Sequence, residues 1–491
     1  MTMPEAGAAT PAYKRIVAVA FVLGLFMDIL DTTIVNVALP TLAIEFDATT
    51  NQIEWVVTGY LLSLAIWIPA SGWLGDRFGT KKIFILALAI FTTASALCGL
   101  AWSLESLVVF RVIQGVGGGM LTPVGTAMLY RAYPPIERPR ASAILASVTV
   151  LAPAIGPVLG GFLVEYLSWR WIFFVNVPIG IFGVIFSVLK LQEHKEGAAG
   201  RFDLAGFVLA GGGLALVLFG LAEGPTQGWG STIVLGSLIT GAVLLALLTW
   251  VELHIDKPML DLRLFAERSF RTPNVVSFCS TGALIGVLFL LPQFLQGPRG
   301  LTPFQSGLTT FPQAFGVILM ARVVGTKLYP VIGPRRLATA GTFGTAMITS
   351  LFLFVGLETS QWWIRLLMFT RGLTIGLIFI PVQAAAFARI RPKDTGRASS
   401  LFQSQRQVAS AVGVAFLATI LVESLNALLP TARTAHQQAV AGMEAFHAAI
   451  LGAVLLCVIG TIAALFLNDQ DAAPTMRPRV VETEIEVRAT V

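Results

Sequence analysis

Residues Gly24–Pro40, GLFMDILDTTIVNVALP, form the back half of an apolar run that is long enough to cross a lipid bilayer. Two carboxylates lie inside this run. A charged side chain at the centre of a bilayer costs about 2.5–3.5 kcal/mol on insertion scales, so such residues face a protein interior or a water-filled cavity. On an ideal helix, with about 100° between neighbours, four polar residues fall within an arc of about 140°: Asp28, Asp31, Thr32 and Asn36. We therefore predict one polar face on this helix.

Two interpretations of Asp28 and Asp31 stay open. In the structural one, each carboxylate hydrogen-bonds neighbouring backbone and holds a helix bundle together. In the other, at least one of them exchanges protons, because a buried carboxyl without a fixed cation favours its neutral form and releases its proton when charge approaches. Two carboxylates on one face favour proton exchange, since each needs its own partner in a setting that supplies few.

The composition is that of a polytopic membrane protein. The 491 residues are 55% hydrophobic and only 12% charged, and the mean hydropathy is +0.79. A soluble protein carries about twice that share of charged residues, which excludes a soluble enzyme and a nucleic-acid binder. The four histidines lack metal-ligand spacing, the three cysteines form no CxxC pair, and no GxxxxGK[ST] occurs. We expect no metal, no cofactor and no ATP-driven step in this polypeptide.

Apolar runs of spanning length predict fourteen transmembrane helices. They lie near residues 16–39, 51–73, 82–102, 106–129, 141–166, 171–190, 203–222, 232–252, 272–294, 304–326, 336–357, 363–388, 399–422 and 445–467. If the chain starts in the cytoplasm, the cytoplasmic connections hold most of the 33 Lys and Arg residues. The opposite connections then hold only Arg170, Arg299, Arg365 and Arg433. This excess follows the positive-inside rule, so we predict a multi-pass protein of the plasma (inner) membrane with both termini cytoplasmic.

A repeat relates the two halves of the sequence. Arg140-Ala-Ser returns as Arg397-Ala-Ser, and Arg111 returns as Arg371 at a similar offset. Such a repeat predicts two parallel six-helix halves around a central site, as in many secondary transporters. The two remaining helices, 203–222 and 232–252, fall between the halves. The predicted division is an N-terminal half 1–190, a linker with two additional helices 191–271, a C-terminal half 272–468 and a cytoplasmic tail 469–491.

The loop between the second and third spans carries the first family signature. Its sequence, GWLGDRFGTKK at 72–82, resembles the cytoplasmic motif GxLxDRxGxKK of the major facilitator superfamily. Glycine permits a tight turn and close helix approach, and the charged residues can pair across helices in one access state. The alternative is an ordinary topogenic loop. The resemblance implies a gating role for Gly72, Asp76, Arg77, Gly79, Lys81 and Lys82. The second-half counterpart, 326–336, has lost the acidic residue, so a latch there should be weaker.

The fourth span contains a buried arginine. Its sequence RVIQGVGGG, residues 111–119, resembles the fourth-helix motif of the superfamily, in which this arginine is tied to proton transfer. A guanidinium at that depth needs a partner, and Asp28 or Asp31 is the nearest plausible one. A purely structural ion pair is the alternative to pairing that changes during transport. Close helix packing explains the glycines better than a phosphate loop does.

The fifth span carries PAIGPVLGG at 153–161, which resembles the motif that marks antiporters within the superfamily. Its prolines remove helix hydrogen bonds, and Gly156 with Gly160 forms a small-residue face, so we expect a bent, tightly docked helix at the interface of the halves. A plain packing kink is the alternative, and the direction of transport is implied by the resemblance alone. The motif residues are Gly156, Pro157, Gly160 and Gly161.

Two further stretches narrow the resemblance to the fourteen-helix drug:proton antiporters. Residues 30–40, LDTTIVNVALP, look like the first-helix signature of that group, with Asp31 at the position of its carboxylate. Residues 168–180, SWRWIFFVNVPIG, look like its connection between the fifth and sixth helices. Asp28 is not part of the signature, which leaves open which aspartate is the primary proton carrier. The span 304–326 has no carboxylate, which argues against export of divalent cations.

We therefore predict an all-α membrane protein with the major facilitator fold, two six-helix halves plus two central helices. The predicted function is proton-coupled antiport that exports lipophilic cationic or neutral drugs by alternating access. In this prediction Asp31 and Asp28 carry protons, Arg111 tunes them, and the 72–82 loop closes the cytoplasmic side. The candidates for contact with substrate are Asn36, Gln114, Gln313 and Gln383.

The predicted partners are small lipophilic substrates, protons and membrane lipids, with no nucleic acid, and the predicted state is a monomer. Two other functions stay open. The same machinery can carry a native lipid or metabolite. A receptor or scaffold that does not transport is the third possibility, and the aspartates and arginines within the spans argue against it.

Overall fold

The computed structural model describes residues 10–195, 202–255 and 258–476. Within these ranges the chain is helical and has no strand. The helices of the first half and the two that follow are α1 (Pro11–Glu45), α2 (Thr50–Ile53), α3 (Trp55–Phe78), α4 (Thr80–Gly99), α5 (Leu104–Ala132), α6 (Arg138–Tyr166), α7 (Trp171–Phe174), α8 (Asn176–Lys190), α9 (Leu204–Gln227) and α10 (Thr232–His254). The second half contains α11 (Arg268–Gln296), α12 (Pro303–Thr310), α13 (Pro312–Val323), α14 (Tyr329–Ile332), α15 (Pro334–Ser350), α16 (Gln361–Ala386), α17 (Thr395–Leu428) and α18 (Ala435–Leu465).

In the described residues, fourteen helical segments are long and apolar enough to cross a membrane, which confirms the predicted number. Each overlaps one predicted span. Several spans are built from more than one helical piece: α7 and α8 together form the sixth, and α12 to α14 form the tenth. Short connections and local caps set the ends. Thr302 and Thr434, for example, each begin a helix with a capping box, in which the hydroxyl and a glutamine three residues later satisfy free backbone N–H groups.

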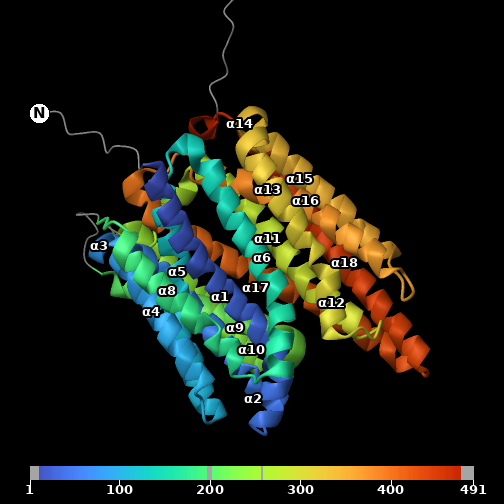
Figure 1. Cartoon of the computed structure of the whole chain (residues 1–491). Coiled ribbons are helices and arrows are strands. Elements are labelled where there is room, and N and C mark those ends of the chain that lie inside the picture. The colour runs from blue at the N-terminus through green and yellow to red at the C-terminus, as the bar shows by residue number, and fades with distance from the viewer. Residues whose placement is uncertain (1–9, 196–201, 256–257, 477–491) are drawn as a thin grey trace, which may run out of the picture.

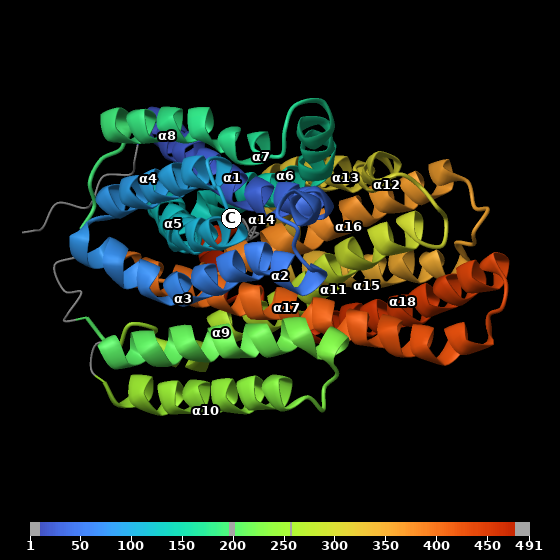
Figure 2. The ribbon, with the colours of Figure 1, turned by 90° about the horizontal axis from the view of Figure 1, so that it is seen from below.

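The helices form two bundles, as the repeat predicts. Helices α1, α3, α4, α5, α6 and α8 pack on one another, and α11, α13, α15, α16, α17 and α18 form a second group (Figure 1). The two additional helices pair with each other along one flank, where α9 lies against α3 of the first bundle and α17 of the second (Figure 2). The fold class is therefore confirmed. The exact boundaries at residues 190, 271 and 468 stay a prediction.

The two bundles meet closely at one end, which we call the basic end because its connections carry residues such as Lys82, Arg140 and Arg336. Ser399 Oγ donates to the carbonyl of Pro123 at 2.8 Å, and the rings of Tyr130 and Phe387 stack with centroids 4.5 Å apart. Toward the opposite end, where α2 lies, the ribbons of the two bundles draw apart (Figure 1).

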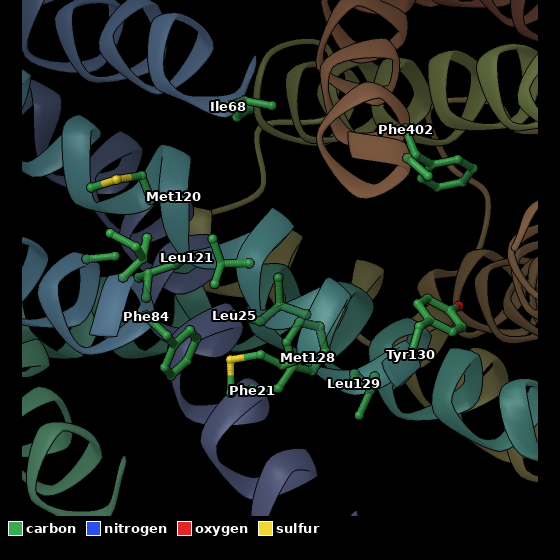
Figure 3. Packing of buried hydrophobic residues seen from close by; sticks show 14 of the residues in the cluster. Phe21, Leu25, Ile68, Phe84, Met120, Leu121, Met128, Leu129, Tyr130 and Phe402 are labelled. Atoms are coloured by element: carbon green, nitrogen blue, oxygen red, sulfur yellow. The ribbon is translucent and has the colours of Figure 1, made fainter. Parts of the chain in front are cut away.

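A buried apolar cluster spans the two bundles near the basic end. Most of its members come from the first bundle, including Phe21, Phe84 and Leu121, while Phe402 comes from α17 (Figure 3). Burial of apolar surface from both bundles stabilises this conformation, since each buried large apolar side chain contributes about 1.5–3 kcal/mol relative to exposure. The structure is thus a fold of two helix bundles that is closed at its basic end.

Helix α6 contacts both bundles, as expected for the fifth span. It packs on α1 in the first bundle and on α13 and α16 in the second. A Cβ built on Gly156 would lie 2.7 Å from Cβ of Thr33, and one on Gly160 would lie 2.9 Å from Cγ1 of Ile34. Gly161 has open space around it. Two of the three glycines therefore permit the close approach of α1 and α6.

We predict that Gly156→Ala combined with Gly160→Ala lowers stability by about 1–3 kcal/mol, because the added methyl groups overpack the contact between α1 and α6. Thermal unfolding of the purified protein in detergent measures this. Gly161→Ala is the matched control on the same helix. It should unfold at the same temperature or slightly higher, because alanine favours a helix over glycine. Equal melting of all three proteins would show that the glycines do not set this packing.

Candidate functional site

The buried arginine of the fourth span pairs with Asp31. Arg111 Nη1 on α5 donates to Oδ2 of Asp31 on α1, and both side chains are fully buried. Oδ1 of Asp31 accepts two more hydrogen bonds, from Gln114 Nε2 at 2.9 Å and from Asn176 Nδ2 at 3.0 Å. Of the two aspartates that the sequence left as partners, the structure selects Asp31.

Arg111 is held by further contacts from α3. Its Nε donates to the carbonyl of Val56 at 2.9 Å, its Nη1 also donates to Oε1 of Gln114 at 2.8 Å, and its guanidinium carbon lies 4.1 Å from the ring centroid of Tyr60. A cation over an aromatic face is attracted by about 2 kcal/mol when water is excluded. Its Nη2 has no hydrogen-bond partner among the described residues. The guanidinium is thus firmly placed but keeps a spare donor.

Asp28 lies in a different environment. The hydroxyl of Tyr60 donates to its Oδ1 at 2.5 Å, and the hydroxyl of Thr122 donates to its Oδ2 at 3.0 Å. In the described chain no ion pair joins Asp28 to a cation. The two aspartates therefore differ in kind: Asp31 has a fixed positive charge beside it, whereas Asp28 has neutral hydroxyl donors. Tyr60 links them, because it binds Asp28 and covers Arg111.

Glycines make this arrangement possible. A Cβ on Gly118 would lie 2.7 Å from the Tyr60 hydroxyl and 2.8 Å from Oδ1 of Asp28, so a side chain there would displace that hydrogen bond. Gly115 and Gly117 lie equally close to the backbone of α3 and α4, respectively. The prediction that the glycine run serves helix packing is confirmed.

The loop motif at 72–82 contacts the second bundle. Gly72 N donates to Oγ of Ser400 on α17 at 2.9 Å, and Asp76 pairs with Arg131 of α5 at 2.7 Å. A Cβ built on Gly396 would lie 2.8 Å from Oδ1 of Asp76, so this carboxylate sits beside the first turn of α17. The first turn of a helix carries partial positive charge and attracts an anion. Asp76 is thus ion-paired within its own bundle and lies against the first turn of a helix of the other bundle.

The other motif residues shape the turn. Gly79 has a φ of 106°, a conformation that glycine adopts without strain, and the backbone N–H of Lys81 donates to Oε1 of Glu193 at 3.0 Å. Lys81 Nζ donates to the carbonyl of Val188 at 2.8 Å. Arg77 and Lys82 are exposed. The contacts of Lys81 therefore fix α4 to the end of α8 rather than to the second bundle.

The second-half counterpart of the loop motif, residues 326–336, has an acidic partner elsewhere in the chain. The backbone N–H of Arg335 donates to Oδ1 of Asp469 at 3.0 Å, and Gly333 has a φ of 86°. Glu193 and Asp469 hold corresponding places, since each follows the last helix of its half and caps the helix that begins after the glycine. The chain after α18 therefore supplies the carboxylate that the 326–336 stretch lacks.

Three of the four residues predicted to contact substrate are buried in this conformation, while Asn36 is exposed. Gln114 belongs to the Asp31 cluster. Gln313 accepts from Nη1 of Arg371 at 2.6 Å, and Nε2 of Gln383 has no hydrogen-bond partner among the described residues. Gln114 and Gln313 are buried because each buried arginine needs hydrogen-bond acceptors, and the amide oxygens of these two residues supply them.

The fifth-span motif is only partly described. Gly156 and Gly160 lie against α1, and Gly161 faces open space. The side chain of Pro157 lies outside the described residues. No group of three or more His, Cys, Asp or Glu that could hold a metal occurs in the part of the chain that the structure describes.

Sequence reasoning missed Tyr60, Thr122 and Asn176. Asn176 stands within the quoted 168–180 stretch, and its place in an apolar run was a signal that it needs a buried partner. Tyr60 and Thr122 gave no comparable signal, because both residue types are common in spans and their partner is distant in sequence.

Comparison with known proteins agrees with this geometry. The model of the Major Facilitator Superfamily matches residues 21–414. The chain belongs to the major facilitator superfamily. This family consists of transporters rather than enzymes.

Two bacterial relatives and one solved structure show how far the similarity extends. The chain is 34% identical over 412 residues to the multidrug resistance protein B homolog of Mycobacterium tuberculosis, covering 82% of this chain and 76% of that protein. It is 30% identical over 508 residues to the uncharacterized MFS-type transporter YhcA of Bacillus subtilis, covering 95% of each. The crystal structure of the human organic anion transporter MFSD10 superposes with a TM-score of 0.63 at 16% identity, covering 91% of this chain and 100% of that one. That last similarity concerns the fold alone.

The latch contacts lead to a prediction. Asp76→Asn should open the basic end more often, because it removes the charge that binds Arg131 and the first turn of α17; we expect a shift of about 1–2 kcal/mol. Spin labels on Lys82→Cys and Lys393→Cys, one in each bundle, report the distance. The native cysteines are buried and need no replacement.

Asp469→Asn is the matched control, since that carboxylate caps a helix within one bundle. It should leave the distance distribution unchanged. An Asp76→Asn protein with the wild-type distribution would contradict a latch at this position.

Proposed function

We propose that this chain is a proton-coupled antiporter that exports lipophilic cationic or neutral compounds by alternating access. The observation that carries the proposal is the buried Arg111–Asp31 pair, placed inside the membrane-spanning region with Asp28 one turn away. A helix bundle without a transport function would not be expected to keep such groups, because ionisable residues in membrane spans are energetically costly and mark ion pathways. The multidrug resistance name of one relative supports the class of cargo.

Protonation of Asp31 would drive the cycle. Arginine stays charged, so a proton on Asp31 leaves Arg111 as a buried cation without its counter-ion, a state that costs about 3–5 kcal/mol. Gln114, Asn176 and Tyr60 would then compete for the guanidinium, and the helices that carry them would move. Asp28, which has no cation beside it, serves as the second proton site in this proposal. Deprotonation restores the pair and the conformation described here.

The direction of transport follows from the membrane orientation that we propose. With the basic end in the cytoplasm, as the positive-inside rule requires, this conformation is closed to the cytoplasm by the contacts of Gly72, Asp76 and Ser399 with their neighbours. Substrate would leave from this state, and protons would enter from outside. Each charge that crosses the membrane potential supplies about 2.3 kcal/mol per 100 mV.

A transporter of a native lipid or metabolite is the second candidate, and the second bundle favours it. Arg371 is fully buried and binds Gln313, Thr349 and the carbonyl of Ala283, with no carboxylate partner in the described chain. Arg406 on α17 lies 5.7 Å from the ring centroid of Phe379, and its Nε has no hydrogen-bond partner among the described residues. Uncompensated guanidinium groups suit cargo with a carboxylate or another strong acceptor.

The proposal predicts which aspartate carries the coupling. In proteoliposomes with an imposed pH gradient, ethidium should trigger proton flux through the wild type. Asp31→Asn should reduce this flux by at least about tenfold, because the neutral side chain cannot exchange a proton. Asp28→Asn should reduce it less. An internal pH dye measures the flux.

The controls separate the alternatives. Asp469→Asn removes a carboxylate that caps α15 outside the Asp31 cluster, and this variant should transport as the wild type does. Loss in Asp28→Asn with full activity in Asp31→Asn would move the primary site to Asp28. No triggered flux across a panel of drugs would contradict the drug antiporter, and no flux with lipids or metabolites either would support a receptor or scaffold.

A substitution of Arg406 tests the second candidate function, transport of a native lipid or metabolite. If cargo carries an acceptor group, Arg406→Gln should lower export of a carboxylated amphiphile by about tenfold, since a hydrogen bond to a charged group contributes about 1.5–3 kcal/mol. Export of ethidium should change little. Paired uptake assays into inverted vesicles compare the two compounds, and equal effects on both would remove the support that Arg406 gives to this candidate.

A further inference from the structure

A groove opens between the two bundles at the basic end. Its volume is about 590 Å³, and its first wall comes from the start of α1 and from α6, with Arg15, Arg140 and Ile144. The second wall comes from α13 and the π-helical segment η3 (Val324–Leu328), with Ile318, Arg322 and Thr326. The groove belongs neither to the Asp31 cluster nor to the 72–82 latch.

The groove carries an unbalanced positive charge. Arg15, Arg140 and Arg322 are exposed, and no hydrogen bond or ion pair joins their guanidinium groups to another residue that the structure describes. The one acidic lining residue, Glu137, is already paired with Lys14 at 2.8 Å. Three guanidinium groups therefore remain for an anion, and guanidinium forks match the geometry of phosphate oxygens.

Part of the lining is apolar and belongs to the membrane-spanning segments. Ile144 and Ile318 line the groove inside the spans Pro135–Tyr166 and Phe304–Ile332. Arg322 stands ten residues before the end of its span, or about 15 Å along a helix, so its long side chain must reach toward the interface to be solvated. An anion with an apolar tail satisfies both parts of the groove at once.

The walls also touch directly. A Cβ on Gly325 would lie 2.9 Å from the carbonyl oxygen of Pro139, so the π-helical segment packs against the start of α6. Insertions of this kind in a helix are frequent at functional positions. Because one wall belongs to each bundle, a ligand in the groove bridges them in the conformation that is closed at this end.

We propose that this groove binds an anionic phospholipid from the leaflet around the basic end, with its phosphate on Arg15, Arg140 and Arg322 and an acyl chain on Ile144 and Ile318. Basic pockets between membrane helices on the cytoplasmic side of a bilayer bind such headgroups, and the positive-inside rule places the basic end on that side. The lipid stabilises the closed basic end and is not transported. The site is thus independent of the proton site and of the exported cargo.

The test measures lipid retained by the purified protein. Wild-type protein in mixed micelles is offered phosphatidylglycerol or phosphatidylcholine with the same acyl chains, and native mass spectrometry counts the bound molecules. We expect wild type to prefer phosphatidylglycerol. The combined variant Arg15→Gln, Arg140→Gln and Arg322→Gln should bind it at least about tenfold more weakly.

The matched control removes three basic residues of the same end that do not line the groove: Arg335→Gln, Arg336→Gln and Lys393→Gln. This control should bind as wild type does. An equal loss in both triple variants would overturn the proposal, because general surface charge would then account for binding. Unchanged binding in the groove variant would overturn it as well.

A second variant separates a lipid from a soluble anion. Ile144→Trp keeps every charge but fills the acyl part of the groove, so it should weaken phosphatidylglycerol binding, while glycerol phosphate should compete poorly with the lipid on wild type. Effective competition by glycerol phosphate with no effect of Ile144→Trp would identify a free phosphate site and overturn the lipid. The melting temperature of each variant confirms that it is folded.

Discussion

A guanidinium that cannot lose its proton is buried in the membrane-spanning region, and the first bundle is arranged to compensate it. Arg111 needs an anion, and Asp31 is placed against it by the close packing of α1 and α5. Neutral donors then complete the coordination of the carboxylate, while Tyr60 and the carbonyl of Val56 complete that of the arginine. Removing either charge leaves the other uncompensated, so the packing of the first bundle depends on this pair.

The second bundle repeats the fold without repeating this chemistry. Arg371 occupies the place that corresponds to Arg111, but its acceptors are an amide, a hydroxyl and a backbone carbonyl. A neutral shell holds a cation in the same way at every pH, whereas a carboxylate can be protonated. The proposed proton step therefore belongs to the first bundle. The second bundle offers positive charge and hydrogen-bond donors, and it joins the first mainly through α6, α17 and the basic end.

Hydropathy and charge placement predicted the fourteen spans, because a bilayer requires long apolar segments wherever the chain crosses it. The partner of Arg111 was narrowed to two residues for the same reason, since few anions are available at that depth. The roles of Gln114 and Gln313 were not predicted, because a glutamine in a span looks the same whether it serves cargo or an arginine. The role of Asp469 was not predicted, because it accepts from the backbone N–H of Arg335, 134 residues earlier in the sequence, and no local pattern records such a contact.

The features that stabilise the conformation closed at the basic end all lie at that end of the molecule. Asp76 of α3 lies beside the first turn of α17, and the apolar cluster joins Phe402 to the first bundle. The groove lined by Arg140 and Arg322 lies between α6 and α13. The central claim is that protonation of Asp31 alternates with its pairing to Arg111. Infrared difference spectroscopy on substrate binding measures this most directly. The account predicts a protonated-carboxyl band that changes in wild type and loses the contribution of Asp31 in Asp31→Asn. The same band in both proteins would contradict it.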